Sequence, residues 1–280
     1  MPRKLDLRTG RPVWFAYRAP KVATDRLTRD VKTDVLIVGM GISGAMIAEA
    51  LTAQGRSVIC IDRRGPLKGS TPATTALVQF EIDQPLTALS RMIGKAPAQQ
   101  AWRRSRIAVT NLRGRIEGLG IDCDPVGRQS LYLAGTTLGP SDLRAEADAR
   151  REAGIAADYL KPLQLKGRFG IDRDGAILSQ ENLALDPRKL TAGLLNKAAQ
   201  RKAKFYSPVE AIKFQDGRDE VIVGTRDGPT VTAKNVVLAT GYELTDIVPA
   251  AAHQVISTWA IATKPQPRKL WPGAALIWEA

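Results

Sequence analysis

Residues 35–62 read VLIVGMGISGAMIAEALTAQGRSVICID, and this stretch decides the fold of the 280-residue chain. The apolar run at 34–38 predicts a buried strand. The helical spacing of residues 42–53 predicts a helix that ends at Gly55, because glycine readily adopts the left-handed cap. A second apolar run at 57–61 predicts another strand. Strand, glycine turn, helix and strand in this order predict a βαβ unit.

The turn inside this unit has the spacing GxGxxG, in Gly39-Met40-Gly41-Ile42-Ser43-Gly44. This spacing is a weak signal alone and gains weight from the strand before it and the helix after it. Gly39 allows a tight turn, Gly41 leaves room for a pyrophosphate at the backbone, and Gly44 lets the helix pack close to the strand. The first helical residues, Ile42 and Ser43, offer N–H groups and partial positive charge to phosphates. The turn therefore predicts a bound dinucleotide.

An acidic residue, Asp62, ends the second strand at the distance where such units hold the ribose. Its carboxylate can accept hydrogen bonds from the hydroxyls of the adenosine ribose. A carboxylate there also repels a 2′-phosphate, which argues against NADP. Arg63 and Arg64 follow directly and weaken that argument slightly, and Arg63 is itself a candidate contact to the nucleotide.

The chain is basic, with a formal net charge of +13 and a pI of about 10.0. Such a field favours anionic ligands. The basic residues are scattered, with pairs such as Arg103-Arg104 and Arg150-Arg151 on helix-like stretches. No basic stripe is interleaved with aromatic residues. This distribution disfavours nucleic acid as a partner.

No apolar run approaches the ~18 residues of a membrane-spanning helix. The segment 1–34 is basic and lacks the apolar core of a signal peptide, and its apolar patch at 13–16 is expected to pack on the body of the protein. Cys60 lies in an apolar run and is expected to be buried, whereas Cys123 lies in a polar stretch where a free thiol fits. Two cysteines without CxxC spacing predict neither a disulfide framework nor a metal site. A cytoplasmic protein is the expectation.

The rest of the chain alternates helices and strands. Helices are predicted at 85–94 and 97–119, a strand at 129–134, and a helix from an N-cap at Ser141 to Ala153. Residues 161–183 read as short strands and turns. Asp186 followed by Pro187 signals the start of a helix. Further strands are predicted at 205–214, 220–225, 230–233 and 236–239, with a hairpin turn at Asp227-Gly228.

With these elements in place, the sequence resembles the FAD-dependent oxidoreductases grouped with D-amino-acid oxidase, glycine oxidase and sarcosine oxidase. Three stretches carry the resemblance, and their order and spacing match the family across residues 30–245. They are the unit 34–62, the loop Gly69-Ser70-Thr71-Pro72-Ala73-Thr74-Thr75, and Ser207-Pro208-Val209 with the strands that lead to Ala239-Thr240-Gly241.

The resemblance implies FAD as the cofactor and assigns further residues to its site. Ser70, Thr71, Thr74 and Thr75 belong to a hydroxyl-bearing loop that the family places near the flavin and the pyrophosphate. Val209 is the counterpart of a valine that meets the adenine. The turn Ala239-Thr240-Gly241 is the counterpart of one that returns to the nucleotide.

The implied fold class is α/β (α+β overall), with a Rossmann-like FAD-binding domain interleaved with a mixed-sheet substrate domain. An N-terminal extension is expected at 1–30. The FAD-binding domain is expected at 31–83 and 181–245, and the substrate domain at 84–180 and 246–280.

The resemblance also implies oxidation of a small-molecule amine or amino acid. Hydride passes to flavin N5, the substrate becomes an imine, and oxygen or another acceptor takes the electrons. Candidate residues on the substrate side are Tyr242, Trp259, Lys264 and Trp271, of which Tyr242 and Lys264 are the candidates for a catalytic role. Relatives carry a further segment after this point, so we expect the chain to be incomplete at its C-terminus.

Two other readings stay open. A NAD-linked dehydrogenase of the Rossmann type would need an acid/base residue, usually histidine, and the only histidine is His253. Flavin chemistry needs no such residue, so the scarcity of histidine favours FAD modestly. The other reading is a truncated nucleotide-binding chain without catalysis. Within the flavoenzyme reading, the basic charge leaves open a substrate carried on tRNA.

Overall fold

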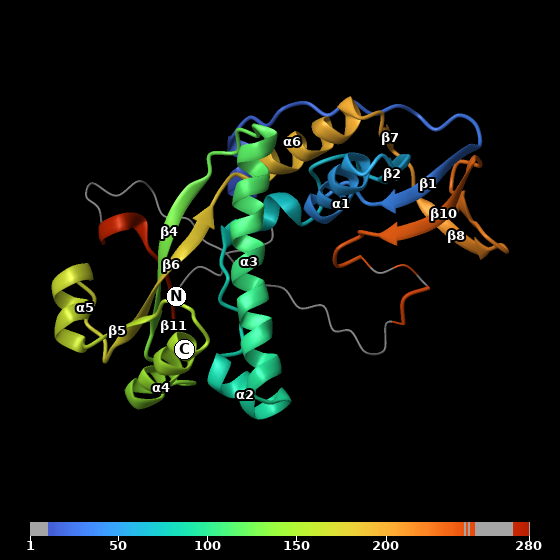
Figure 1. Ribbon diagram of the computed structural model, residues 1–280. Helices are drawn as coiled ribbons and strands as arrows, with labels where there is room; N and C mark the ends of the chain where they lie inside the picture. Colours follow the sequence, from blue (N-terminus) through green and yellow to red (C-terminus); the bar gives the residue numbers. More distant parts are fainter. Residues whose placement is uncertain (1–10, 244, 246, 250–270, 280) are drawn as a thin grey trace, which may run out of the picture. The chain divides into compact units, whose positions relative to one another are not determined.

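The computed structural model describes residues 11–243, 245, 247–249 and 271–279 (Figure 1). Within this part of the chain there are two compact units. The first contains 11–75, 121–123 and the described residues of 186–249, and the second contains 76–120, 124–185 and 271–279.

The units divide at positions close to the expected domain boundaries. The divisions fall after Thr75 and before Asp186, whereas the sequence pattern places them at 83 and 181. Residues 11–30, expected as an extension, belong to the first unit, as do residues 247–249.

A six-stranded sheet forms the centre of the first unit, in the order β7-β2-β1-β10-β9-β8 (Figure 1). Strands β7, β2, β1 and β10 run parallel, and β9 and β8 continue as an antiparallel meander. The bounds are β1 Val31–Val38, β2 Val58–Ile61, β7 Lys204–Tyr206, β8 Ala211–Asp216, β9 Val221–Thr225 and β10 Thr230–Leu238. The predicted strands at 230–233 and 236–239 are thus one continuous strand.

The parallel strands of this sheet are apolar along their length. All four residues of β2 are buried, and Leu36 and Ile37 of β1 are completely buried. Parallel strands are usually covered on both faces, which is why their sequences read as continuous apolar runs. One core cluster joins β1 and β2 to residues of β9 and β10, including Val223 and Val231.

Two helices of the first unit, α1 (Ile42–Ala53) and α6 (Pro187–Gln200), pack against each other. The helix predicted at 42–53 is confirmed, and Gly55 after it has a φ of +76°. The start of α6 is confirmed as well. The Asp186 carboxylate caps this helix, because it accepts hydrogen bonds from the backbone N–H groups of Arg188 at 2.8 Å and Lys189 at 3.0 Å.

The second unit is built on a mixed sheet of order β11-β4-β6-β3, with β5 paired to β6. Strands β4 and β6 are its long central pair, and β11 joins β4 in parallel. The strands are β3 Leu77–Val78, β4 Val126–Leu133, β5 Asp158–Leu160, β6 Ala176–Ala184 and β11 Leu276–Glu279. The helices are α2 Leu86–Ile93, α3 Lys95–Leu119, α4 Pro140–Glu152 and α5 Pro162–Phe169.

Alternation along β4 and β6 sends side chains to two separate apolar clusters. Leu131 and Leu178 pack with Leu165 and Phe169 of α5, whereas Tyr132 and Ile177 pack with residues of α4. Each cluster is lined by residues from helix and sheet together, so the sheet buries both of its faces. Trp271 packs at the edge of the α5 cluster.

A buried ion pair links the helices of the second unit. The Glu146 carboxylate accepts hydrogen bonds from Arg150 Nε and from the backbone N–H groups of Leu86 and Thr87, each at 2.8 Å. The Arg150 guanidinium lies 4.5 Å from the centre of the Trp102 ring. Burial raises the pKa of Glu146, but the Arg150 charge and the backbone hydrogen bonds outweigh it and hold that pKa below its usual range.

The structure corrects three sequence predictions. The helix expected to start at a Ser141 cap begins at Pro140, with Gly139 at the N-cap position. Residues 161–183, predicted as short strands and turns, contain a bend within the turn expected at 172–175, but they also contain the helix α5 before it and most of the nine-residue strand β6 after it. The missed signal for α5 was Pro162 at the first helical position followed by Gln164, whose side chain accepts from Lys161 N.

The third correction concerns the strand predicted at 205–214. It is two strands, β7 and β8, which lie at opposite edges of the six-stranded sheet. The break falls at Ser207-Pro208, because proline has no N–H to continue a strand ladder. The hairpin turn at Asp227-Gly228 between β9 and β10 is confirmed.

Both cysteines are buried. Burial raises the pKa of the Cys60 thiol to about 12, as expected for a cysteine that acts as a small apolar side chain. Cys123, expected in a polar turn, is also buried. No helix in the described part of the chain has the length and apolar character needed to cross a membrane.

Replacing Glu146 by glutamine is predicted to lower the free energy of unfolding by about 3 kcal/mol, because it leaves the Arg150 charge buried without its partner. The pKa of Glu146 is lowered on folding, so the wild-type ion pair stabilises above the unfolded pKa and loses this contribution as pH falls through the folded pKa. Glu146→Gln should therefore flatten the pH dependence of stability below about pH 4.5. Urea denaturation between pH 7 and pH 3 measures both effects.

The matched control for this variant is Glu152→Gln, on the same helix. Glu152 pairs with Lys95 at the surface, where both side chains are more than half exposed. Exposed pairs contribute little. Equal losses for the two variants would contradict the role assigned to the buried pair.

Candidate functional site

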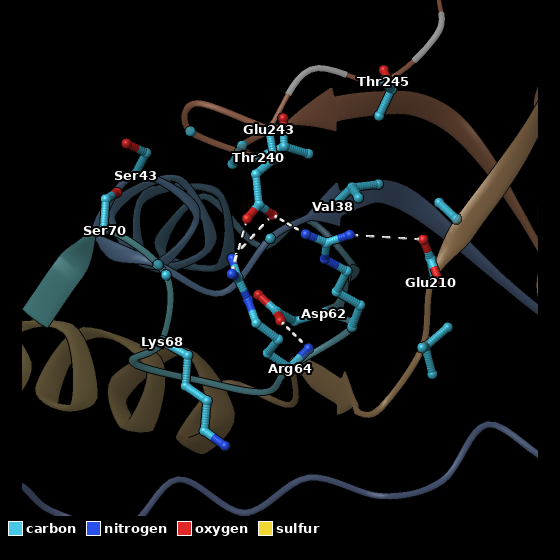
Figure 2. Close-up of a pocket in the computed structure, with 18 of the residues that line it drawn as sticks. Val38, Ser43, Asp62, Arg64, Lys68, Ser70, Glu210, Thr240, Glu243 and Thr245 are labelled. Carbon is cyan, nitrogen blue, oxygen red and sulfur yellow. Dashed lines mark hydrogen bonds and ion pairs between the residues drawn. The ribbon is translucent and has the colours of Figure 1, made fainter. Parts of the chain in front are cut away.

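A cavity of about 530 Å³ opens in the first unit, next to the carboxyl ends of β1, β2 and β10 (Figure 2). Ligands of open α/β sheets bind in this position, outside the carboxyl ends of parallel strands. The lining comes from the glycine turn, the chain after β2, the loop at 68–71, strand β8 and the turn after β10.

Glycine is required in the turn because backbone atoms approach it closely. A Cβ on Gly39 would lie 2.4 Å from the carbonyl oxygen of Ala239, and Gly39 has a φ of +115°. A Cβ on Gly44 would lie 2.0 Å from the carbonyl oxygen of Gly39. The first contact packs the turn on the end of β10, and the second packs α1 on the turn. Gly44 thus shapes the site without lining the cavity.

Gly41 has a different surrounding. A Cβ there would lie 3.0 Å from the hydroxyl oxygen of Thr71, which accepts a hydrogen bond from the backbone N–H of Ile42 at 3.1 Å. The first N–H groups of a helix have no partner within the helix. Thr71 therefore caps the first of them at the start of α1, and both Ile42 and Ser43 line the cavity.

The Asp62 carboxylate organises the turn. Its Oδ2 accepts from the backbone N–H of Met40 at 2.8 Å, and its Oδ1 accepts from those of Arg64 at 2.7 Å and Gly65 at 2.9 Å. A carboxylate has about four acceptor positions, so one on Oδ2 remains for a ligand hydroxyl. Asp62 both fixes the loop between the glycines and faces the cavity.

An ion-pair network lies along the cavity (Figure 2). The Glu243 carboxylate pairs with Arg63 at 2.7 Å and with Arg64 at 2.9 Å, and Glu210 pairs with Arg226 at 2.7 Å. A hydrogen bond from Arg226 and the charges of Arg226 and Arg63 hold the pKa of Glu210 below its usual range, against a smaller opposing effect of burial. Five cationic and three acidic side chains line the cavity, so it favours an anion.

Twelve of the cofactor-site residues predicted from the sequence line the cavity. These are Gly39, Gly41, Ile42, Ser43, Asp62, Arg63, Ser70, Thr71, Val209, Ala239, Thr240 and Gly241. Three candidates lie outside the lining, namely Gly44, Thr74 and Thr75. The Tyr242 side chain is 72% exposed and does not line the cavity, and Lys264, Trp259 and His253 lie outside the described residues.

Part of the cavity lining was not predicted from the sequence. Arg64 and Lys68 follow the acid, Glu243 follows the glycine of the Ala239-Thr240-Gly241 turn, and Phe214 lies on β8. The first three stand within six residues of a recognised motif, so proximity was their signal. Phe214 and its neighbours on β8 carry no local signal, because only the pairing of β8 with β9 brings them to the cavity.

This fold and this cavity define a dinucleotide-binding protein of the α/β class. Residues 34–278 match the family described as DAO, FAD dependent oxidoreductase, and the chain belongs to that family. FAD is the cofactor of the family. A curated relative, the "Putative Rieske 2Fe-2S iron-sulfur protein YhfW" of Bacillus subtilis (strain 168), is 26% identical over 224 residues.

Solved structures share the fold. Glycine oxidase from Geobacillus kaustophilus has a TM-score of 0.60 and 22% identity, over 74% of this chain and 55% of that one. L-proline dehydrogenase from P. horikoshii has a TM-score of 0.62 and 19% identity, over 75% and 53%. L-amino acid deaminase from Proteus myxofaciens has a TM-score of 0.62 and 19% identity, over 79% and 48%.

The matched region is shorter than these proteins. It is 76% of this chain but 43% of the Bacillus protein, and about half of each solved structure. The chain therefore spans about half the length of the relatives that it matches.

The cavity suits the ADP part of FAD. The missing Cβ of Gly41 and the N–H groups at the start of α1 leave a place for the pyrophosphate. The free acceptor position on Asp62 fits a ribose hydroxyl. Val38, Val209 and Phe214 give part of the lining an apolar surface.

Replacing Gly44 by alanine is predicted to lower the free energy of unfolding by about 2–3 kcal/mol, because the new Cβ must displace the Gly39 carbonyl. The matched control is Gly114→Ala on α3, where a Cβ meets nothing within 4 Å. That change should stabilise by about 0.5–1 kcal/mol. Urea midpoints of both variants test the contrast, and a Gly44→Ala protein as stable as wild type would refute the close packing.

Proposed function

We propose that the protein is an FAD-dependent oxidoreductase that oxidises an amine or an amino acid. The observation that carries the proposal is the cavity at the carboxyl ends of β1, β2 and β10, where the glycine turn, Asp62 and Thr71 meet. Membership of the FAD dependent oxidoreductase family supports it. The names of the solved structures, glycine oxidase, proline dehydrogenase and amino acid deaminase, support an amino acid or related amine as the substrate class.

The first unit would hold the ADP part of the cofactor. Ile42 N and Ser43 N lie at the positive end of the α1 dipole and would face the pyrophosphate. Asp62 would accept from the ribose, and Val209 would contact the adenine. Ser70 and Thr71, with Thr74 and Thr75 behind them, form the loop that would lie beside the pyrophosphate and flavin. Ala239, Thr240 and Gly241 would close the cavity from the end of β10, and Arg63 would border the adenosine.

FAD supplies an acceptor for the two electrons that leave the substrate. The carbon beside the nitrogen gives up a hydride and the nitrogen gives up a proton, so the substrate becomes an imine that water hydrolyses. Oxygen or another acceptor then takes the electrons. Tyr242 and Lys264 remain the proposed candidates for a catalytic role, and a cytoplasmic location remains the expectation.

The second unit would supply the substrate side. We assign its mixed sheet, with β4 and β6 at the centre, to the substrate domain predicted from the sequence. The chain passes from the first unit to the second and back. This arrangement fits an oxidoreductase in which one unit holds the nucleotide and the other selects the substrate.

The absorbance of the purified full-length protein tests the proposal. We expect the two visible bands of bound flavin, and their bleaching when amines or amino acids are added under anaerobic conditions. A colourless protein that binds NADH would refute the proposal. Bound flavin that no amine or amino acid reduces would leave a nucleotide-binding chain without this activity.

Replacing Asp62 by alanine is predicted to weaken FAD binding by tenfold or more, because a hydrogen bond to a charged group contributes about 1.5–3 kcal/mol. The loop between the glycines also loses its acceptor. The control is Asp34→Asn in the middle of β1, outside the cavity lining, where the carboxylate pairs with Lys234. Fluorescence titration of the apoprotein with FAD measures both, and equal affinity in Asp62→Ala and wild type would show that the nucleotide lies elsewhere.

A further inference from the structure

The segment before β1 is attached to the first unit at separate points. Near its end, Asp25 pairs with the edge of β7, because Asp25 N donates to Phe205 O at 2.9 Å and Ser207 N donates to Asp25 O at 3.1 Å. In its middle, Asn196 of α6 donates to Lys21 O at 3.2 Å. We call residues 11–30 the N-terminal strap.

The beginning of the strap is a short 3-10 turn, Val13–Ala16, that Arg188 holds from α6. Arg188 Nη1 donates to the carbonyl oxygens of Trp14 and Tyr17, both at 2.9 Å. Its guanidinium also lies 4.9 Å from the centre of the Phe15 ring. Arg188 lies two residues after the Asp186 cap, which accepts its backbone N–H, so the capped end of α6 holds this turn.

Burial of apolar surface does not explain why the turn is held. None of its residues is buried, and Val13 is 51% exposed, so the apolar patch expected to pack on the body stays largely at the surface. The specific contacts are polar and aromatic. These contacts orient one side chain of the turn toward the loop at 69–75, the candidate cofactor loop.

That side chain is Trp14. Its indole Nε1 donates to the carbonyl oxygen of Thr74 at 2.7 Å. Thr74 follows the 3-10 turn Thr71–Ala73, and the Thr71 hydroxyl at the start of this turn accepts from Ile42 N at the glycine turn. A continuous path of hydrogen bonds and chain therefore runs from α6 through Arg188, Trp14 and the loop to the start of α1.

We propose that Trp14 is a positioning residue for the cofactor, through its hydrogen bond to the loop at 69–75; the inference rests on the proposed function for the identity of the ligand. Thr71 and Pro72 in the middle of this loop are buried, whereas Ser70, Thr74 and Thr75 are exposed. A pinned loop loses less conformational entropy when the ligand binds, which strengthens binding without a contact to the ligand. The strap thus forms part of the site although it lies outside the βαβ unit.

Trp14→Phe tests this in the full-length protein, since it keeps an aromatic ring and removes the N–H donor. The first readout is hydrogen exchange of residues 69–77 in the apoprotein, which we expect to become severalfold faster. The second is the dissociation constant for FAD, which we expect to rise about three- to tenfold, the size of one hydrogen bond. The midpoint of thermal unfolding should stay near that of wild type.

Tyr17→Phe is the matched control. It changes an aromatic residue of the same strap but keeps the ring beside Trp14 and the carbonyl that accepts from Arg188. Exchange and FAD affinity should both remain at wild-type values. Arg188→Gln loosens the turn from the other side, and its effect on FAD affinity should not add to that of Trp14→Phe, because residues on one path are coupled.

The outcomes separate the two proposals. Faster hydrogen exchange of residues 69–77 in Trp14→Phe would support the contact between Trp14 and the loop. If the wild-type protein bound no FAD, the proposed function would be overturned while this contact would stand. Wild-type exchange in Trp14→Phe would overturn the positioning role. Faster exchange with an unchanged dissociation constant would also overturn it, because the loop would then move without consequence for the cofactor.

Discussion

The contact on which the first unit depends is the close approach of backbone atoms at Gly39. Its α-carbon faces the carbonyl of Ala239 at the end of β10, and its own carbonyl faces Gly44 in the first turn of α1. Three chain segments far apart in the sequence meet there without an intervening side chain. The cavity lies where the ends of these segments meet, outside the carboxyl ends of the strands. A Cβ on Gly39 or on Gly44 would push the segments apart.

The polar groups around this contact follow from it. Because the turn is narrow, Met40 N points at the end of β2, where Asp62 accepts it, and the same carboxylate receives two N–H groups from the chain that follows. The arginines that come next are then directed along the cavity, where Glu243 holds both. Asp62 therefore binds both the glycine turn and the chain segment that carries Arg63 and Arg64.

The sequence predicts what is local. The helix at 42–53 and the start of α6 could be predicted, because apolar periodicity and glycine spacing in the first case, and the Asp186 cap in the second, act within a few residues. The sequence could not show that residues 205–214 form two strands at opposite edges of the sheet. It also could not show that Phe214 and Ile212 reach the cavity, because their positions depend on the pairing of β8 with β9. The helix α5 was missed where turn residues at 172–175 outweighed the quieter signal of Pro162.

The hydroxyl of Thr71 at the start of α1 has a consequence for how the loop at 69–75 is held. The Thr71 hydroxyl gives one N–H group at the start of α1, that of Ile42, an acceptor from the chain itself. A phosphate would meet the next N–H groups of the helix, beginning with that of Ser43. The loop at 69–75 and the start of α1 are therefore joined by a hydrogen bond within the chain, independently of any nucleotide.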